Sequence, residues 1–315
     1  MRFYQDIFAE ITSYFKQLDP NVDIDKLIPK SPFTHEKYPE LLKTKEDEEK
    51  YIIRHKALNL LERYLNYQNR HIETIPRHVY CSRELEEKIK EGILDSNMVS
   101  AIEMIREELS KGRDVSGHLS KLADWLDKED ALLDDWSIYH FHLGNDKESP
   151  SSKYYKRTGL LLMVYIPRHF DNAYLLDVSE EHRNPLAFAR QGYLKIIDDN
   201  WPELLERFRF SGIKTEFGCS DEERLQLRRA GINTLENING DFFANPGGGI
   251  TSAKTSVKCQ LAKNRINNKL LGICKSLEEH NVPYKVVLNS NSQEFIVKNL
   301  SSGKYFAKVS LKLST

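Results

Sequence analysis

The sequence predicts an α+β protein, because different periodic patterns occupy different parts of the chain. Apolar residues recur at helical spacing through the first 135 residues, strand-like apolar runs follow, and both patterns occur in residues 213–315. The chain has 315 residues, of which 40% are hydrophobic and 10% aromatic. At roughly 150 residues per domain this length allows two domains with cores of their own. The aromatic content excludes wholesale disorder.

Residues 1–130 are predicted to form an acidic, helical region. Apolar residues at helical spacing predict a helix at the N-terminus and further helices at about 46–67 and 98–109. Several prolines between these first two helices predict a loop. A brief extended segment, residues 78–81, precedes Ser82, which we expect to cap a helix whose first turn is acidic.

Residues 131–212 are predicted to form a central α+β region around a small antiparallel sheet with flanking helices. The predicted strands are residues 138–143, 159–166 and 173–178. Pro167 ends the second strand and a polar turn follows it, so a three-stranded meander is the simplest topology. A helix at 187–198 is expected to close this region.

Residues 213–315 are predicted to form a basic α+β domain of helices and antiparallel hairpins. A helix is expected from Ser220 to Arg229, with Arg228 and Arg229 on the surface, and a longer one at about 252–279. Three apolar runs separated by polar turns follow, which is the pattern of hairpin strands.

The net charge of −1 is unevenly distributed along the chain. Residues 1–135 carry 21 basic and 28 acidic residues (−7), whereas residues 242–315 carry 11 basic and 3 acidic residues (+8). Clustered lysines release counterions when they bind phosphates, so the basic segment predicts a nucleic-acid contact. Docking against the acidic N-terminal region explains the charges equally well, and that region is also a candidate surface for a protein partner. The candidate nucleic-acid-binding residues are Lys156, Lys254, Lys258, Lys263, Arg265 and Lys269.

Several classes of protein lack support in the sequence. No secretory signal and no apolar run of the roughly 20 residues that a membrane span needs is found, so we expect a cytoplasmic protein that does not contact a membrane. The four cysteines have no paired spacing and are expected to be free thiols. The nucleophile elbow, the zinc-protease motif and the dinucleotide-binding motif are missing, and no cofactor is expected.

The densest group of candidate functional residues lies on the first predicted strand. Because side chains alternate along a strand, His140 and His142 are expected on one face, opposite an apolar face. Three interpretations are open: strand histidines with hydrogen-bonding partners, two ligands of a metal completed by Asp177 or His182, or a general acid and base. In the last case Lys156 or Arg157 would stabilise the charge that develops during RNA cleavage.

This part of the chain also resembles a known family. The run from Tyr139 to Asn145, followed by Lys156 and Arg157, an apolar strand, a further strand and His182, is similar to the strand pattern of RelE/HigB-type ribonuclease toxins. The resemblance covers about 50 residues. It implies a small antiparallel sheet with flanking helices that cleaves RNA without a metal. It also implies substrate-binding or catalytic positions at His142, Lys156, Arg157 and His182.

The glycine-rich segment that begins at Gly247 contains residues 248–255, which differ from the phosphate-binding loop motif by Ala253 in place of a glycine. A turn of this kind at a helix N-terminus presents amides to an anion. No later strand ending in aspartate is available to hold magnesium, which argues against an NTPase. A phosphate contact and an ordinary turn capped by Ser252 are both consistent with the segment.

The sequence therefore favours an RNA-directed nuclease or toxin-like protein, acting in cellular defence by His/Arg acid–base chemistry. The predicted catalytic residues are His140, His142, Arg157 and His182. The alternative is a non-enzymatic nucleic-acid-binding or protein-interaction protein that works through the basic C-terminal domain.

Overall fold

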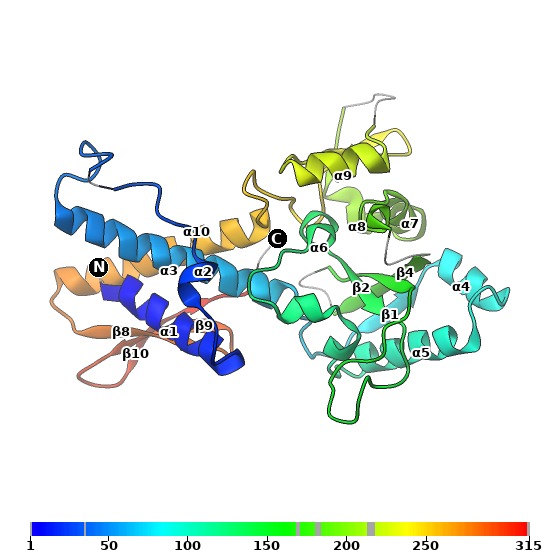
Figure 1. Cartoon of the computed structure of the whole chain (residues 1–315), viewed down its shortest axis with the longest axis horizontal. Helices are drawn as coiled ribbons and strands as arrows, with labels where there is room; N and C mark the ends of the chain where they lie inside the picture. Colours follow the sequence, from blue (N-terminus) through cyan, green and yellow to red (C-terminus); the bar gives the residue numbers. More distant parts are fainter. Residues whose placement is uncertain (1, 35, 168–170, 180–183, 213–217, 314–315) are drawn as a thin grey trace. The chain divides into compact units, whose positions relative to one another are not determined.

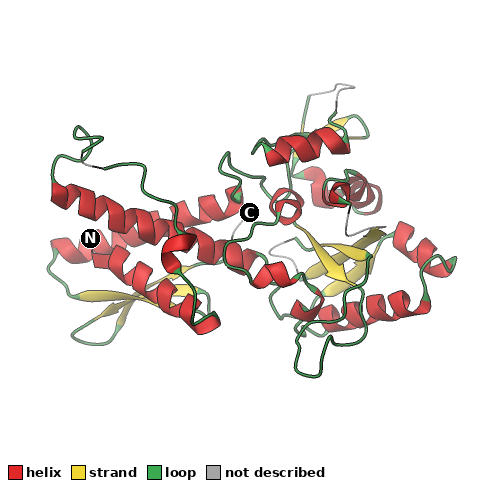
Figure 2. Cartoon of the chain, in the orientation of Figure 1, coloured by secondary structure: helices red, strands yellow, loops and turns green. Residues whose placement is uncertain are grey.

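The structure, a computed structural model, describes residues 2–34, 36–167, 171–179, 184–212 and 218–313. The chain divides into two compact units. The first unit combines both ends of the chain, Met1–Gln68 and Cys259–Ser314, and the second is Asn69–Lys258. Each unit contains helices and a sheet (Figure 2), so the predicted α+β class is confirmed. The division differs from the three regions expected at 1–130, 131–212 and 213–315, because the N-terminal helix packs with the C-terminal strands.

The second unit is built on a four-stranded sheet with the strand order β1-β4-β3-β2. Its strands are β1 (His78–Cys81), β2 (Ile138–His142), β3 (Leu161–Tyr165) and β4 (Asn172–Ser179). The pairs β2–β3 and β3–β4 are antiparallel, which confirms the predicted meander. The extended segment before Ser82 becomes a fourth strand, parallel to β4. The pairing of β1 with β4 joins residues that are far apart in sequence, so no local sequence pattern predicts it.

Helices cover both faces of this sheet, as Figure 1 shows for α4 and α5 on one side and α7 and α8 on the other. These helices are α4 (Arg83–Lys90), α5 (Ser96–Ser110), α7 (Gly192–Asn200) and α8 (Glu203–Glu206). Tyr139 and Phe141 face the core beneath α4 and α5, whereas Ile138 faces the core beneath α7. The alternation expected for the first predicted strand therefore separates two cores.

In the second unit, two helices begin directly after serines that cap them. The Ser82 hydroxyl accepts a hydrogen bond from the Leu85 amide (3.1 Å), which confirms the predicted N-cap. Ser220 and Glu223 form a capping box before α9 (Asp221–Arg229).

The helix expected at 187–198 is split into a 3-10 turn, η3 (Pro185–Phe188), and α7. The other elements of this unit are η1 (Ser116–His118), η2 (Lys121–Asp124), α6 (Ala131–Trp136) and a small sheet of β5 (Arg209–Phe210), β6 (Glu236–Ile238) and β7 (Asp241–Phe243).

The first unit packs helices on a three-stranded antiparallel sheet with the order β10-β9-β8. Its elements are α1 (Arg2–Leu18), α2 (Ile24–Leu27), most of α3 (Lys45–Asn69), most of α10 (Val257–Glu279), β8 (Tyr284–Asn289), β9 (Glu294–Asn299) and β10 (Tyr305–Ser310). Helix α1 lies along β8 (Figure 1), where the Asp6 and Glu10 carboxylates accept hydrogen bonds from the Val286 (2.9 Å) and Leu288 (3.1 Å) amides. These carboxylates satisfy backbone donors at an edge strand.

Candidate functional site

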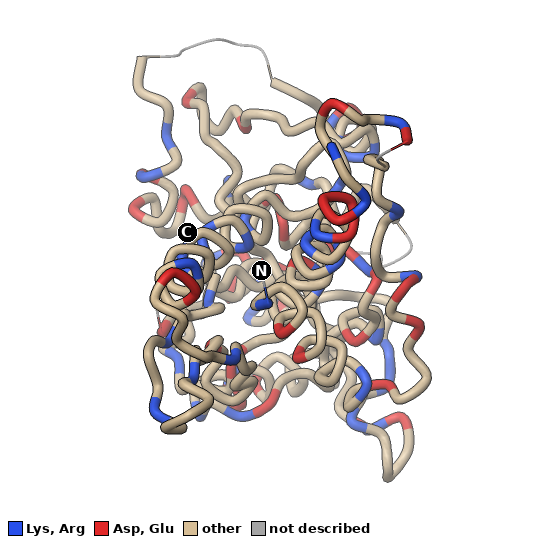
Figure 3. Tube along the Cα trace, turned by 90° about the vertical axis from the view of Figure 1, so that its left-hand side faces the viewer, with Lys and Arg blue, Asp and Glu red and all other residues tan. Residues whose placement is uncertain are grey.

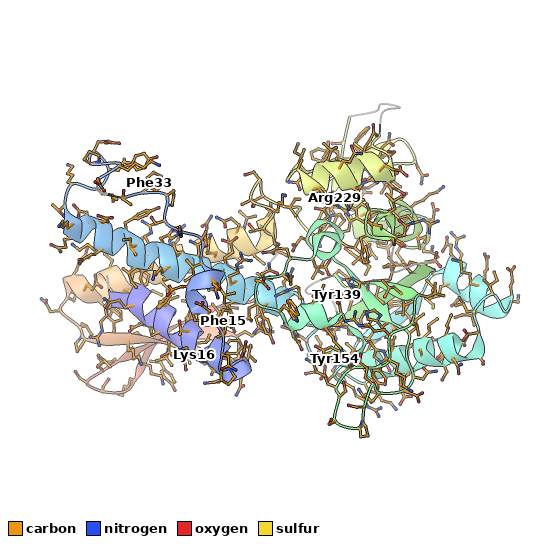
Figure 4. The ribbon with its side chains drawn as sticks, viewed as in Figure 1. Phe15, Lys16, Phe33, Tyr139, Tyr154 and Arg229 are labelled. Carbon is orange, nitrogen blue, oxygen red and sulfur yellow. The ribbon has the colours of Figure 1, made fainter. Side chains whose placement is uncertain are left out.

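A cavity of about 380 Å³ opens beside β2 in the second unit, and two of the predicted catalytic residues, His140 and Arg157, line it. Its wall is mixed in character. The charged residues that line the cavity are Arg70, Lys128, Glu129, Asp130 and Arg157. The rest of the lining is Ser120 together with leucine, alanine and aromatic side chains, including Tyr139, which Figure 4 labels. A mostly apolar concavity with a few polar groups of this kind is typical of a ligand site.

The imidazole of His140 is held between a carboxylate and an aromatic ring. Asp130 Oδ1 accepts the Leu133 amide (3.1 Å) and so caps α6, while its Oδ2 lies 3.7 Å from His140 Nδ1. The Phe188 ring packs edge-on against the imidazole, with 5.2 Å between centroids. Within the described ranges, His140 Nδ1 makes no hydrogen bond. The carboxylate and the aromatic ring therefore flank the imidazole where it lines the cavity.

His142 occupies a different environment from His140, although alternation along β2 places both on one side of the strand. Its side chain is only 2% exposed and does not line the cavity. Its backbone carbonyl accepts a hydrogen bond from Nδ1 of the buried His118 (3.0 Å). The structure therefore separates the predicted pair, and His142 lies where it supports the sheet.

Arg157 and Lys156 lie on the long connection between β2 and β3, and both are exposed. Lys156 pairs with Asp146 (3.3 Å) rather than lining the cavity.

Asp124 holds the connection between β2 and β3 in place. It accepts hydrogen bonds from His71 Nε2 (3.0 Å) and from the Tyr154 hydroxyl, and it forms an ion pair with Lys153. Figure 4 labels Tyr154. Burial alone would raise the pKa of Asp124, but these three partners hold it below its usual value.

The described residues do not supply the further ligands that the metal-binding interpretation of His140 and His142 needs. His182 lies outside the described residues, and Asp177 forms an ion pair with Lys88 (2.7 Å). Among the residues whose positions are described, no group of three or more His, Cys, Asp or Glu side chains is arranged to hold a metal ion.

The predicted nucleic-acid-binding residues of the basic segment do not form one exposed set. Lys254 and Lys269 are exposed, whereas Lys258 is only 6% exposed. Lys263 is buried against Glu62 (2.5 Å), so this lysine is neutralised by the acidic N-terminal region. Arg265 donates to a backbone carbonyl at 2.5 Å. Burial removes Lys258 and Lys263 from the exposed basic surface that the sequence predicts, so these two lysines do not support a phosphate contact. Figure 3 shows basic and acidic positions mixed along the trace.

The glycine-rich segment is fixed to α6. The amides of Gly247 and Gly249 donate to the carbonyl oxygens of Asp135 (2.7 Å) and Asp134 (3.0 Å). A side chain at position 247 would clash with the Asp134 carbonyl. Two of the amides expected to cradle an anion are therefore used inside the protein, and the following helix begins only at Val257.

Several charged residues of the second unit are buried, which the sequence did not indicate. Arg228, expected on the surface, is 6% exposed and donates to the Asp135 carboxylate, and its guanidinium lies 4.4 Å from the centroid of the Trp136 ring. Arg224 and Glu236 are fully buried together. The sequence feature that could have predicted these buried ion pairs is the pair of acids at 134–135 together with the arginines at 224 and 228. Most charged residues are exposed, so this feature does not distinguish a buried pair from a surface one.

Replacing Asp134 with asparagine is expected to change how stability depends on pH. Burial, and then the nearby carboxylates of Glu129 and Asp130, raise the pKa of Asp134 well above its usual value. The folded state therefore keeps a proton that the unfolded chain releases above about pH 4, so the free energy of unfolding falls as pH rises, by at most about 1.4 kcal/mol per pH unit. Asparagine preserves the shape and the acceptor for Asn69 (3.3 Å) but cannot ionise.

Urea unfolding at pH 5, 6.5 and 8 measures this difference. All three tryptophans, Trp125, Trp136 and Trp201, belong to the second unit, so their fluorescence follows that unit alone. The stability of Asp134→Asn relative to the natural chain should increase from pH 5 to pH 8. Parallel curves for the two proteins would contradict a protonated Asp134.

No family model, curated protein or solved structure matches the chain. In the described residues, no helix is both long and apolar enough to cross a membrane.

Proposed function

We propose that the cavity beside β2 is the active site of an RNA-directed ribonuclease. The observation that carries the proposal is the convergence of His140 and Arg157, from separate segments, on one cavity with Asp130 next to the imidazole. General acid–base chemistry needs a histidine in reach of substrate, and phosphoryl chemistry needs fixed positive charge beside it.

The proposed chemistry is intramolecular attack of the RNA 2′-hydroxyl on its own phosphate. His140 takes the proton of the 2′-hydroxyl while the oxygen attacks phosphorus and the 5′-oxygen leaves with a proton from a general acid or water. Asp130, 3.7 Å from Nδ1, stabilises the imidazolium that forms. Arg157 stabilises the additional negative charge on the phosphate oxygens. The wall carries three basic residues, Arg70, Lys128 and Arg157, against the two acids Glu129 and Asp130.

The resemblance to RelE/HigB-type toxins supports the same reaction class and extends the proposal to a role in cellular defence, with RNA in the cytoplasm as the substrate. His142 enters this proposal as a residue that stabilises β2, since its side chain is buried away from the cavity. His182 keeps its proposed catalytic role, for which the described residues give no geometry.

A cleavage assay on labelled single-stranded RNA and duplex DNA, each with and without EDTA, tests the proposal. RNA should be cut to fragments with 2′,3′-cyclic phosphate ends in both conditions, and DNA, which has no 2′-hydroxyl, should stay intact. Arg157→Ala should slow RNA cleavage by about 10²- to 10³-fold, the range seen when one donor to a developing oxyanion is removed. Arg229→Ala is the matched control, because Arg229 is also an exposed arginine of the second unit (Figure 4). An intact RNA substrate, or equal losses in the two variants, would refute the proposed site.

A further inference from the structure

The sheet of the first unit has one buried face and one outward face. The pairing places Val286 opposite Val297, and Phe295 opposite Val309, and these side chains are buried. Residues directly opposite one another in antiparallel strands share a face, so the alternate positions form the outward face.

The outward face combines lysines with an aromatic ring. One row across the three strands is Lys285, Lys298 and Tyr305, and the next is Val287, Ile296 and Lys308, of which Ile296 is buried (6% exposed). The Lys285 and Lys308 side chains are 46% and 56% exposed. Tyr305 is 59% exposed, and Phe306, at the irregularity in β10, is 43% exposed. We call Lys285, Lys298, Tyr305, Phe306 and Lys308 the platform.

The charge of this hairpin region is strongly positive. From Tyr284 to Ser310 the sequence has four lysines and one glutamate, a net charge of +3. Two platform lysines form ion pairs at long separations, Lys285 at 3.4 Å from Glu10 and Lys308 at 3.9 Å from Glu294. The carboxylates are only 20% and 25% exposed, whereas the lysine side chains are about half exposed, so water screens the attraction and the ammonium groups stay accessible to an anion. Lys298 Nζ lies 5.4 Å from the centroid of the Tyr305 ring, which places a cation beside a stacking surface.

We propose that the platform binds single-stranded RNA. Aromatic rings on which bases stack, beside lysines that follow the phosphates, are the two components of single-strand recognition without sequence preference. A duplex hides its base faces and would leave Tyr305 and Phe306 without a role. This binding site lies in the first unit, shares no residue with the cavity beside β2, and holds whether or not that cavity cleaves RNA.

Fluorescence anisotropy with a labelled oligo-uridine of about 12 nucleotides, within the site size of single-strand binding folds, tests the platform. The full chain carrying His140→Ala is used throughout, so that any cleavage does not consume the probe. Tyr305→Ala/Phe306→Ala should weaken binding by about fivefold or more with the salt dependence unchanged. Lys298→Gln/Lys308→Gln should weaken binding and reduce the slope of log affinity against log salt by about 1.4, since each phosphate contact on a single strand contributes about 0.7.

Lys16→Gln/Lys275→Gln is the matched control, because both lysines are exposed on helices of the same unit; Figure 4 labels Lys16. Unchanged binding in this control and weaker binding in both platform variants would support the proposal. Absence of binding by the His140→Ala chain, an equal loss in the control, or equal affinity for an RNA duplex would overturn it. Competition by polyglutamate as effective as by unlabelled RNA would also overturn it, in favour of an acidic peptide. None of these outcomes depends on the cleavage assay.

Discussion

Replacing Glu236 with alanine is expected to destabilise the second unit by about 3–5 kcal/mol, the usual loss when one partner of a buried ion pair is removed. Arg224 Nε lies 2.9 Å from both carboxylate oxygens of Glu236, and a terminal guanidinium nitrogen lies 2.8 Å from one of them. Both side chains are fully buried. Gln191 and Thr234 also donate to this carboxylate, each at 3.1 Å. Alanine would leave the buried guanidinium with the partly exposed Asp221 carboxylate (2.7 Å) as its remaining counter-charge.

Tryptophan fluorescence in urea measures the loss, since all three tryptophans report on the second unit. The midpoint should fall while the slope against urea stays constant. Glu107→Ala is the matched control, because Glu107 also pairs with a basic residue, Lys111 (2.6 Å), but with both side chains about half exposed. That change should leave the urea midpoint almost where it is, because water screens an exposed ion pair. Similar losses in the two variants would mean that burial of the Arg224–Glu236 pair is not what makes it important.

The parts of the fold predicted from sequence are those fixed by local patterns. Strands β2, β3 and β4 were predicted because apolar runs of strand length are separated by a turn, and the Ser82 cap because one hydroxyl satisfies a local amide. The parallel pairing of β1 with β4 depends on contacts between distant segments, and so does the contact of α1 with β8. Local periodicity carries no information on either contact, and so it did not predict that the two ends of the chain share a unit.

For the candidate site too, the sequence predicts local features but not contacts between distant segments. Alternation along β2 correctly placed His140 and His142 on one side of the strand, but burial depends on which segments cover that side. His140 meets a cavity and Asp130, whereas His142 is enclosed. The charge environment of Lys263 is a further example. Its sequence neighbours are basic, and only the fold shows that the Glu62 carboxylate neutralises this lysine.

His140→Ala is expected to reduce RNA cleavage by about 10²- to 10⁴-fold, the usual contribution of a positioned general acid or base. The change removes an imidazole from the wall of a cavity of about 380 Å³, and the space it leaves can admit a free imidazole molecule. Added imidazole should therefore restore part of the activity of the alanine variant and leave the natural protein unaffected. This rescue distinguishes lost chemistry from lost structure, which the tryptophan fluorescence of the variant checks directly.

His78→Ala is the matched control for this prediction, because His78 is an exposed strand histidine of the same unit that does not line the cavity. Its cleavage rate should equal that of the natural chain. The buried His142 provides a second comparison: alanine there should lower stability, and imidazole should not rescue it, because that side chain is buried and does not line the cavity. If the folded His140→Ala variant cleaves RNA at the natural rate, His140 is not the base. If the folded variant keeps the natural kcat, shows a raised KM and gains nothing from imidazole, the side chain binds substrate and does not transfer the proton.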